Sequence, residues 1–353
     1  MKLIHTSDIH LDSPLTSRLT PFKAKERRRE LITSFRQTVD DAVKMNVGGI
    51  IIAGDLFDSE NTATRTVDTV LGIIENAPEV MFFYLPGNHE KDRVLREGLS
   101  LPKNLFIFEK DWTYFSIGDI TVAGRSETDK NMFDSLNLSK NNKNIVVLHG
   151  ELSERSDKNG KIGKRDLSSL PIDYLALGHY HSFSEEKLSE RCVAVYSGTP
   201  EGRGFDEAGD KGYVILDIGS DYNRHTFIKR SKRNLHTLNV DITGVTREIE
   251  LENRVAHAIS GIVSEDLVRV TLTGSHDVGF ERDTEAIRMR FENKFYFFEV
   301  KDESKLRISS EDYKNDISLK GEFIRLVLSK NELTDAEKEK IIECGIRALA
   351  GEE

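Results

Sequence analysis

Residues 2–10 read KLIHTSDIH, an apolar segment that runs directly into ionisable side chains. Leu3 and Ile4 are typical of a buried strand, whereas Asp8 and His10 follow it one residue apart. A strand that ends in this way either carries a polar turn that reaches solvent or contributes half of a metal site. The way in which the other strands end decides between these two interpretations.

Four further β-like segments also end in polar side chains, most of them beside a glycine. The four ends are Gly54-Asp55 with Asp58, Gly87-Asn88-His89-Glu90, His149-Gly150 and Gly178-His179-Tyr180-His181. Ligands of an open α/β sheet collect at the carboxyl ends of its strands, so these side chains are expected to converge in one cleft. One such end alone is more often a turn, but five together indicate a site.

Strands and helices alternate over residues 1–230, which predicts an α/β fold. The segment 22–46 reads as a helix because its apolar residues recur at helical spacing, namely Leu31, Phe35, Val39 and Val43. The run 48–58 is continuously apolar at its start, as in a strand buried on both faces. Residues 153–164 are polar and are expected to form a loop.

Past residue 233 the pattern resets to a compact β-α-β-α-β unit without clustered ligand residues. Two helices are expected after it, over 317–329 and 335–350, the second with Thr334 as its cap. We therefore predict three domains, at residues 1–232, 233–303 and 304–353.

Composition narrows the class of protein. The chain has 353 residues and a formal net charge of −10, which argues against a protein that coats nucleic acid by charge alone. Its two cysteines, Cys192 and Cys344, cannot build a disulfide framework or a cysteine-rich zinc site, and are expected to be incidental thiols. No signal peptide and no apolar run of about 18 residues stand out, so a cytoplasmic location is expected.

The donor atoms at the five strand ends are carboxylate, imidazole and amide, a mixture that favours manganese, iron or zinc. The candidate ligands, too many for one ion, are Asp8, His10, Asp55, Asn88, His149, His179 and His181. Two ions about 3.5–4 Å apart, which share a carboxylate, would use them all and would stabilise a phosphoryl displacement.

The motifs DIH, GDLFD, GNHE, HG and GHYH stand in an order that resembles the calcineurin-like metallophosphoesterase superfamily, over about residues 1–200. The resemblance implies a β-sandwich flanked by helices and two divalent metal ions, Mn²⁺ above all, with Fe²⁺, Zn²⁺ or Mg²⁺ as alternatives. It also implies a role for each ligand. The first metal would be held by Asp8, His10 and His181, the second by Asn88, His149 and His179, and Asp55 would bridge them.

The same resemblance assigns two residues to the chemistry itself. His89 would stand beside the scissile phosphate and donate to the leaving oxygen, and Asp58 would orient His89. Glu90 stands where many nucleases of the superfamily have Asp, a change that the phosphoprotein phosphatases share.

Three features are similar to bacterial DNA-repair exonucleases of the SbcD and YhaO type: SDIHLDSPL at 7–15, SGTPEGRGFDEAGDKGY at 197–213, and a β-α-β-α-β unit like their capping domain. A Mn-dependent DNA exonuclease is therefore expected, with endonuclease activity as an addition. A phosphodiesterase or phosphatase acting on small nucleotides or phosphoproteins is the alternative. A non-catalytic scaffold would lack ligands, and this sequence keeps the full set.

Basic residues give weaker indications of substrate binding. The candidates for phosphate contacts are Lys229, Arg230, Lys232 and Arg233, with Arg125 and Arg203 after glycine-containing motifs. A charge run is, however, usually a solvated face.

The resemblance also implies partners, namely DNA, a second copy of the chain in a homodimer, and an SMC-like coiled-coil ATPase held by C-terminal helices. Apolar stripes on the two tail helices fit such a partner, at Phe323, Leu326 and Val327 and at Ile341, Ile342, Ile346 and Leu349. Packing of these stripes on their own domain is the equal alternative.

Overall fold

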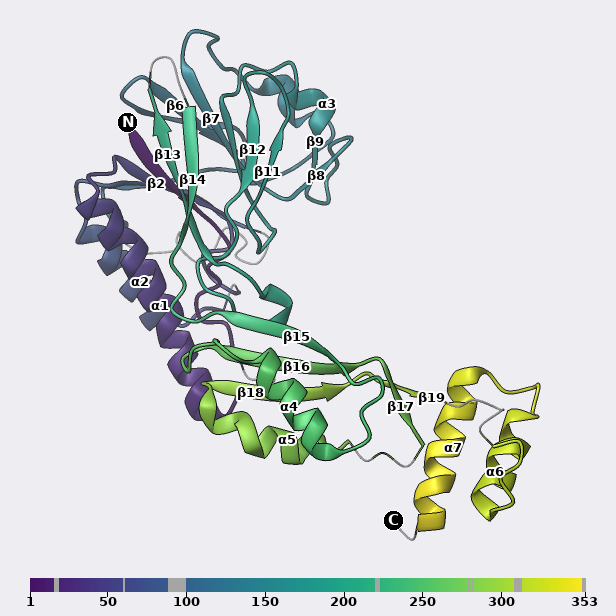
Figure 1. Cartoon of the computed structure of the whole chain (residues 1–353). Helices are drawn as coiled ribbons and strands as arrows, with labels where there is room; N and C mark the ends of the chain where they lie inside the picture. Colours follow the sequence, from purple (N-terminus) through teal and green to yellow (C-terminus); the bar gives the residue numbers. More distant parts are fainter. Residues whose placement is uncertain are drawn as a thin grey trace. The chain divides into compact units, whose positions relative to one another are not determined.

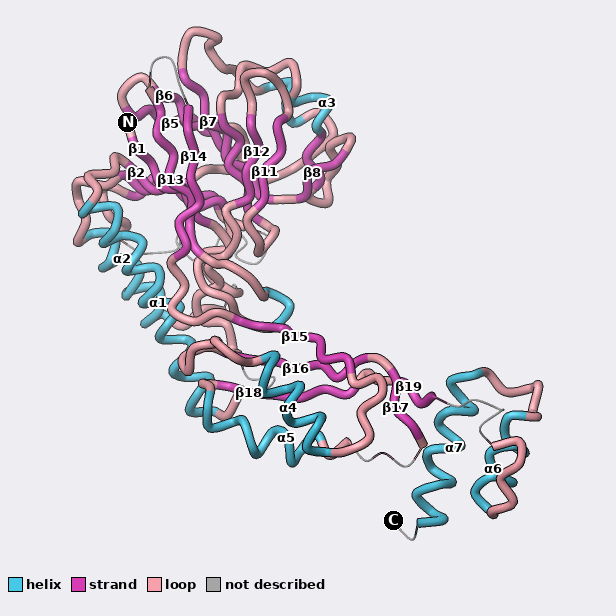
Figure 2. Tube along the Cα trace, in the orientation of Figure 1, coloured by secondary structure: helices cyan, strands magenta, loops and turns pink. Residues whose placement is uncertain are grey.

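The structure is a computed structural model that describes residues 1–15, 19–59, 61–87, 100–219, 223–278, 280, 282–307 and 313–350 (Figures 1 and 2). The chain divides into two compact units, Met1–Asn234 and Leu235–Glu353. The finer division into three domains, at 1–232, 233–303 and 304–353, stays a prediction.

The first unit contains two six-stranded sheets. The first sheet has the order β14-β13-β1-β2-β3-β4. Its strands are β1 (Lys2–Thr6), β2 (Gly49–Ala53), β3 (Met81–Leu85), β4 (Leu105–Ile107), β13 (Gly212–Ile218) and β14 (Asn223–Lys229). Strands β1 to β4 run parallel, with Ile4 opposite Ile50, whereas β13 pairs antiparallel with both β1 and β14.

The second sheet has the order β11-β12-β10-β7-β6-β5. Its strands are β5 (Thr113–Ile117), β6 (Ile120–Gly124), β7 (Lys143–His149), β10 (Tyr174–Gly178), β11 (Ser184–Lys187) and β12 (Val193–Tyr196). The four central strands are parallel, and β5 and β11 close the edges antiparallel.

Alternation of side chains along the strands builds the layers of this unit. In β2, Ile51 faces a core shared with the second sheet, while Ile50 and Ile52 face the helices α1 (Pro21–Lys44) and α2 (Thr64–Glu75). In β7, Val147 joins the shared core and Val146 faces outward to a third cluster. The result is a sandwich of two sheets covered by helices, so the predicted fold class is confirmed.

The polar segment 153–164 is more ordered than the expected loop. Strands β8 (Glu151–Ser153) and β9 (Lys161–Gly163) pair in parallel, and the short helix α3 (Lys164–Leu167) follows. Ile162 is the reason, because its fully buried side chain joins the outer core of the second sheet. The loop prediction was therefore wrong at both ends of this segment.

The second unit contains the expected β-α-β-α-β arrangement. Its elements are β15 (Leu235–Asp241), α4 (Glu248–Ala258), β16 (Leu267–Thr273), α5 (Thr284–Phe291) and β18 (Phe297–Asp302). The three strands form a parallel sheet with β16 in the centre, packed through Val268 and Val270 against Leu251 of α4 and Ile287 of α5. A second small sheet, of β17 (Ser275–Asp277) and β19 (Lys305–Arg307), was not expected.

Helices α6 (Leu319–Leu328) and α7 (Asp335–Ala350) form the described tail. Thr334 caps α7 as predicted, because its hydroxyl accepts from the Glu337 amide while the Glu337 carboxylate accepts from Thr334. None of the helices in the described ranges has the length and apolar character needed to cross a bilayer.

The apolar stripes of the tail are divided between core and surface. Val327 and Ile342 are buried, together with Ile324 and Leu306, whereas other stripe residues stay exposed. The exposed ones are Leu326, Ile341 and Leu349. Packing within the second unit thus accounts for one part of each stripe, and the other part is exposed in the described part of the chain.

Candidate metal centre

The carboxyl ends of strands from both sheets bring the predicted ligands together. After β1 and β2 the chain continues in two parallel turns, in which the amides of Asp8 and His10 donate to the carbonyls of Gly54 and Asp55 at 3.0 Å. His149 is the last residue of β7. These hydrogen bonds hold the loops in register beyond the strands, so the side chains after β1 face those after β2.

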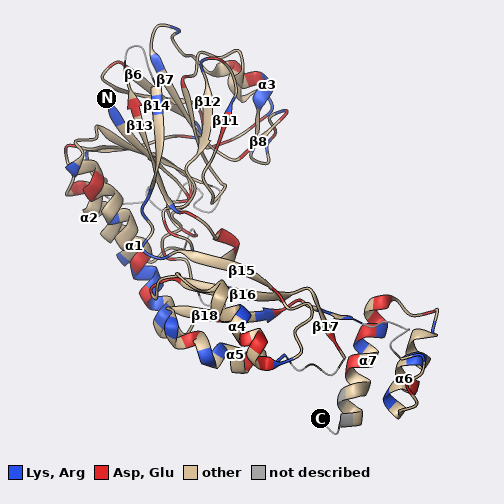
Figure 3. Cartoon of the chain, viewed as in Figure 1, with Lys and Arg blue, Asp and Glu red and all other residues tan. Residues whose placement is uncertain are grey.

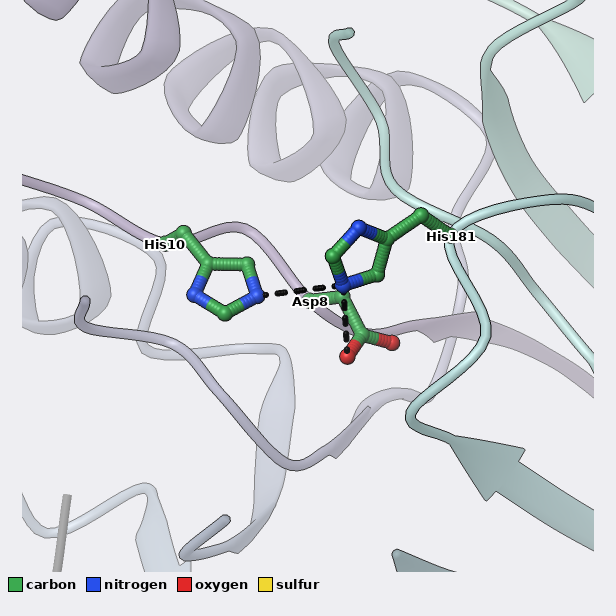
Figure 4. A group of neighbouring side chains, drawn as sticks. All are labelled: Asp8, His10 and His181. Atoms are coloured by element: carbon green, nitrogen blue, oxygen red, sulfur yellow. Dashed lines mark hydrogen bonds and ion pairs between the residues drawn. The ribbon is translucent and has the colours of Figure 1, made fainter. Parts of the chain in front are cut away.

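Two groups of donor atoms result, and each could hold a metal ion. One group contains Asp8, His10 and His181, and the other contains Asp8, Asp55 and His149, with the atoms of each group within 4.8 Å of one another. In the first group, Nε2 of His181 lies 3.4 Å from Nε2 of His10 and 3.8 Å from Oδ1 of Asp8 (Figure 4). In the second, Nε2 of His149 lies 3.3 Å from Oδ2 of Asp55. Asp8 is the residue common to both groups.

The backbone at this site is held in an uncommon conformation. Four residues have positive φ angles, which residues other than glycine rarely adopt. They are Asp8 (52°), His10 (48°), Asp55 (50°) and His179 (107°). Such residues cost about 1–3 kcal/mol each and persist where the surrounding structure enforces them, often at functional sites. The paired turns after β1 and β2 enforce this conformation at Asp8, His10 and Asp55, and the hydrogen bond from the His179 amide to the Asp8 carboxylate enforces it at His179.

Glycines allow the close approach of the ligands. Gly54 has φ 94°, and a Cβ at this position would lie 2.0 Å from Nδ1 of His149. At Gly87 a Cβ would lie 2.1 Å from Oδ1 of Asp55. The glycines at these two strand ends therefore have a steric reason, since a methyl group would displace a ligand.

Neighbouring groups orient the ligands. The Nδ1 atom of His149 lies 2.9 Å from the Ala53 carbonyl, so Nδ1 donates to this carbonyl and Nε2 is the atom that faces Asp55 and could bind a metal. Asp8 accepts from the Ser7 hydroxyl at 2.5 Å and from the His179 amide at 3.0 Å. These contacts fix the carboxylate of Asp8 between the two groups.

The electrostatics of the site favour a cation. Burial would lower the pKa of His149, but its hydrogen bond to Asp55 and the charges of Asp55 and Asp8 raise this pKa to about 9. Asp8 and Asp55 are buried and offer carboxylate oxygens beside imidazole nitrogens. Buried acids with mixed nitrogen and oxygen donors fit a divalent transition metal better than an empty cavity.

His179 is placed differently from the other predicted ligands. Its ring packs edge-on against that of His149, with 5.6 Å between centroids, and neither group of donor atoms includes it. Burial and the nearby His149 lower the pKa of His179. Asn88, His89 and Glu90 lie outside the described residues.

Asp58, predicted to orient His89, contacts other residues of the site in the described part. Its Oδ1 lies 3.4 Å from Nδ1 of His10 and 2.9 Å from Nη1 of Arg203. Burial would raise the pKa of Asp58, but His10 and Arg203 hold it below its ordinary value.

Each of the predicted phosphate-binding cations has a carboxylate partner. The pairs are Arg125–Asp129, Arg203–Glu207, Lys229–Asp210, Arg230–Asp41, Lys232–Glu30 and Arg233–Glu30. Arg233 is buried, whereas the side chains of Lys229 and Lys232 are 69% and 48% exposed. Figure 3 shows basic and acidic residues interspersed over both units, with Lys and Arg on the first turns of α1.

Two residues that the sequence reasoning did not single out hold His181. Glu207 accepts from Nδ1 of His181 at 2.7 Å, and the buried Lys211 donates from Nζ to the His181 carbonyl at 2.6 Å. The Glu207 carboxylate raises the pKa of His181. Glu207 and Lys211 both lie in the segment 197–213, which resembles the nucleases, but sequence spacing alone does not place these two side chains beside His181.

The chain is similar in sequence to several known proteins. The chain is 25% identical over 285 residues to "DNA double-strand break repair protein Mre11" of Methanosarcina acetivorans, covering 76% of this chain and 44% of that protein. It is 27% identical over 235 residues to "Uncharacterized metallophosphoesterase YhaO" of Bacillus subtilis, covering 62% of this chain and 57% of that protein. This chain thus spans about half the length of these relatives.

Among solved structures, a dimetal phosphatase from Danio rerio is similar with a TM-score of 0.43 and 12% identity, over 64% of this chain and 98% of that one. Residues 1–206, more than half of the chain, match the family description "Calcineurin-like phosphoesterase". The sequence motifs of this chain, its sandwich of two sheets and the donor groups at the strand ends agree with that match. The chain belongs to the calcineurin-like phosphoesterase family.

Proposed function

We propose that this chain is a two-metal DNA nuclease that hydrolyses phosphodiester bonds from DNA ends, in DNA repair or DNA-end processing. The observation that carries the proposal is the pair of donor groups that share Asp8, one with His10 and His181 and one with Asp55 and His149. Two adjacent groups of this kind suit two ions that clamp one phosphate.

In this proposal, Asp8, His10 and His181 would hold the first ion, and Asn88, His149 and His179 would hold the second. Asp55 would bridge them, because its Oδ2 lies 3.8 Å from Nε2 of His10 and 3.3 Å from Nε2 of His149. The ions are Mn²⁺ by preference, with Fe²⁺, Zn²⁺ or Mg²⁺ as alternatives, because the donor set mixes imidazole with carboxylate. When bound, they neutralise the charge that develops on the attacking and leaving oxygens. The chain itself supplies the fixed geometry, through the buried ligands and the strained turns after β1 and β2.

His89 is proposed to donate a proton to the leaving oxygen, and Asp58 to orient His89. The contacts of Asp58 with His10 and Arg203 place a carboxylate beside the first donor group. A general acid typically increases the rate of such a reaction by about 100- to 10,000-fold.

DNA is the proposed substrate because relatives at about 25% identity are named for DNA double-strand break repair. The exposed Lys229 and Lys232, with Arg230, could exchange their carboxylate partners for backbone phosphates. A homodimer, an SMC-like ATPase partner and a cytoplasmic location belong to the same proposal. The uncovered apolar residues of α6 and α7 support the partner contact.

Cleavage assays with three substrates test the proposal. Linear duplex DNA, single-stranded DNA and a chromogenic phosphodiester are each incubated with Mn²⁺ or Mg²⁺, using wild type and His89→Ala. We expect Mn²⁺-dependent release of nucleotides from DNA that His89→Ala reduces by about 100-fold or more. Hydrolysis of the chromogenic ester without any cleavage of DNA would replace the nuclease by a phosphodiesterase for small substrates.

A further inference from the structure

Each of the two histidines in the first donor group is backed by a carboxylate. Nδ1 of His10 faces Oδ1 of Asp58 at 3.4 Å, and Nδ1 of His181 faces Oε1 of Glu207 at 2.7 Å. The Nε2 atoms of the two rings lie on the other side, 3.4 Å apart (Figure 4). A carboxylate at Nδ1 favours the tautomer with the proton on that atom and leaves Nε2 able to bind a metal.

One arginine joins these two carboxylates. Arg203 donates from Nη1 to Asp58 at 2.9 Å, and from Nε and Nη2 to Oε1 of Glu207 at 3.0 and 2.7 Å. The backbone amide of Arg203 donates to Oε2 of Glu207 at 2.7 Å. The guanidinium therefore spans from the loop after β2 to the segment after β12, and touches the support of both histidines.

The surroundings make this bridge rigid. The side chains of Arg203 and Glu207 are 17% and 4% exposed, so water competes little for their hydrogen bonds. A guanidinium is planar and has five N–H donors in a fixed fork, which suits two carboxylates at once. Lys211 holds the backbone of His181 through a hydrogen bond to its carbonyl, whereas the bridge acts on the side of the rings.

We propose that Arg203 is a positioning residue for the first metal position, the one between Asp8, His10 and His181. By clamping Asp58 and Glu207 together, it fixes the rings of His10 and His181 so that both Nε2 atoms converge with Asp8. This inference deepens the proposed function and rests on its metal centre. It differs from the expectation that Arg203 binds the substrate phosphate, because three of its side-chain N–H groups are already used within the protein.

Calorimetric titration with Mn²⁺, in the absence of any substrate, tests the bridge. The chain is stripped of metal first, and the compared variants are Arg203→Met, Arg203→Lys and Glu207→Gln. We expect wild type to bind two ions, and Arg203→Met to bind one of them about 10- to 100-fold more weakly while the other keeps its affinity. Arg203→Lys keeps the charge but cannot span both acids, so it is expected to behave as Arg203→Met does.

Two controls separate positioning from folding. Arg191→Met removes another arginine with a carboxylate partner, Asp173 at 2.7 Å, and is expected to leave both affinities unchanged. Thermal unfolding of each metal-free variant shows whether it is folded. If Arg203→Met does not fold, Glu207→Gln tests the bridge in its place, because glutamine retains the shape of the Glu207 side chain. We expect Glu207→Gln also to weaken one ion selectively, since it removes the charge that His181 and Arg203 face.

The outcomes distinguish this inference from the function on which it rests. If wild type binds two ions and folded Arg203→Met and Glu207→Gln bind both with wild-type affinity, the positioning role is wrong. Equal weakening of both ions, or rescue by Arg203→Lys, would also overturn it, because charge alone would then account for the effect. If wild type binds no Mn²⁺, the proposed metal centre itself fails.

Discussion

Nε2 of His149 lies 3.3 Å from Oδ2 of Asp55, and this pair joins the end of β7 in one sheet to the end of β2 in the other. Both side chains are almost completely buried. The pair therefore couples the candidate metal centre to the packing of the sandwich. Occupation of the centre should be visible in the stability of the whole unit and not only in activity.

Removal of metal is expected to lower the thermal stability of the protein. A ligand at 100 times its dissociation constant stabilises the native state by about 2.7 kcal/mol, because it binds the folded chain alone. Calorimetric melting with Mn²⁺ or with a chelator measures the difference. Asp8→Asn should reduce this metal-dependent difference, since Asp8 offers an oxygen to both donor groups, whereas the exposed Asp119→Asn should retain it. An equal response of Asp8→Asn and wild type would contradict the assignment.

Gly54→Ala is expected to damage the centre through a methyl group. A Cβ at Gly54 would lie 2.0 Å from Nδ1 of His149, in addition to the strain of an alanine at φ 94°. Gly209→Ala is the matched control, because Gly209 has φ 96° but no atom within 4 Å of the position that a Cβ would take there. Both variants should lose about 1–2 kcal/mol of unfolding free energy from the backbone.

Only Gly54→Ala should lose more than this amount and also bind less Mn²⁺. Chemical denaturation and elemental analysis of the two variants give the comparison. Equal loss of stability with full metal content in both would show that His149 does not need the space beside Gly54.

A buried ion-pair network makes the first unit sensitive to acid. Burial would raise the pKa of Glu30, but hydrogen bonds from Arg233 and Lys232 and the charge of Arg27 lower it to about 2. The folded pKa is thus below the ordinary value of 4.5, so the stability that Glu30 contributes is complete above pH 4.5 and is lost as the pH falls toward 2.

Glu30→Gln is expected to lower the unfolding free energy at pH 7 by about 3 kcal/mol, because it removes the buried negative charge that Arg27 and Arg233 share. Denaturation of wild type and Glu30→Gln at several pH values should show that the difference shrinks between pH 4.5 and 2. A difference that stays constant over this range would mean that the carboxylate is not held ionised by its partners.

The two cysteines are expected to differ in reactivity. Cys192 is buried, and burial, with the charge of Asp173, raises the pKa of its thiol to about 12, whereas Cys344 is exposed on α7. A rise of this size leaves roughly a thousandfold less thiolate at neutral pH. A thiol reagent should modify Cys344 quickly in the native protein and Cys192 only slowly. The variant Cys344→Ser should therefore lose the fast phase of the reaction. Two fast phases in wild type would place Cys192 at the surface.

The fold could be predicted because its signals are local. The run GIIIA in β2 alternates between two cores, and the helical spacing of Leu31, Phe35 and Val39 places all three in the core beneath α1. Ile162 shows where this reasoning fails, since one apolar residue within a polar segment has no period and becomes core only through tertiary packing.

Some residues of the candidate site could be predicted from the sequence and others could not. Asp8, His10 and Asp55 are recognisable because each follows an apolar strand directly, and the ends of neighbouring parallel strands meet. Glu207 and Arg203 could not be assigned from the sequence, because their partners His181 and Asp58 lie 26 and 145 residues away along the chain. Support of this kind depends on how loops from two sheets cross, which periodicity does not encode.

The central claim is that the strand ends of the sandwich form a two-metal centre, and anomalous diffraction from crystals soaked in Mn²⁺ tests it most directly. We predict two peaks about 3.5–4 Å apart, one among Asp8, His10 and His181 and one beside Asp55 and His149. A map without a peak between these side chains, from crystals that bind Mn²⁺ elsewhere, would contradict the claim.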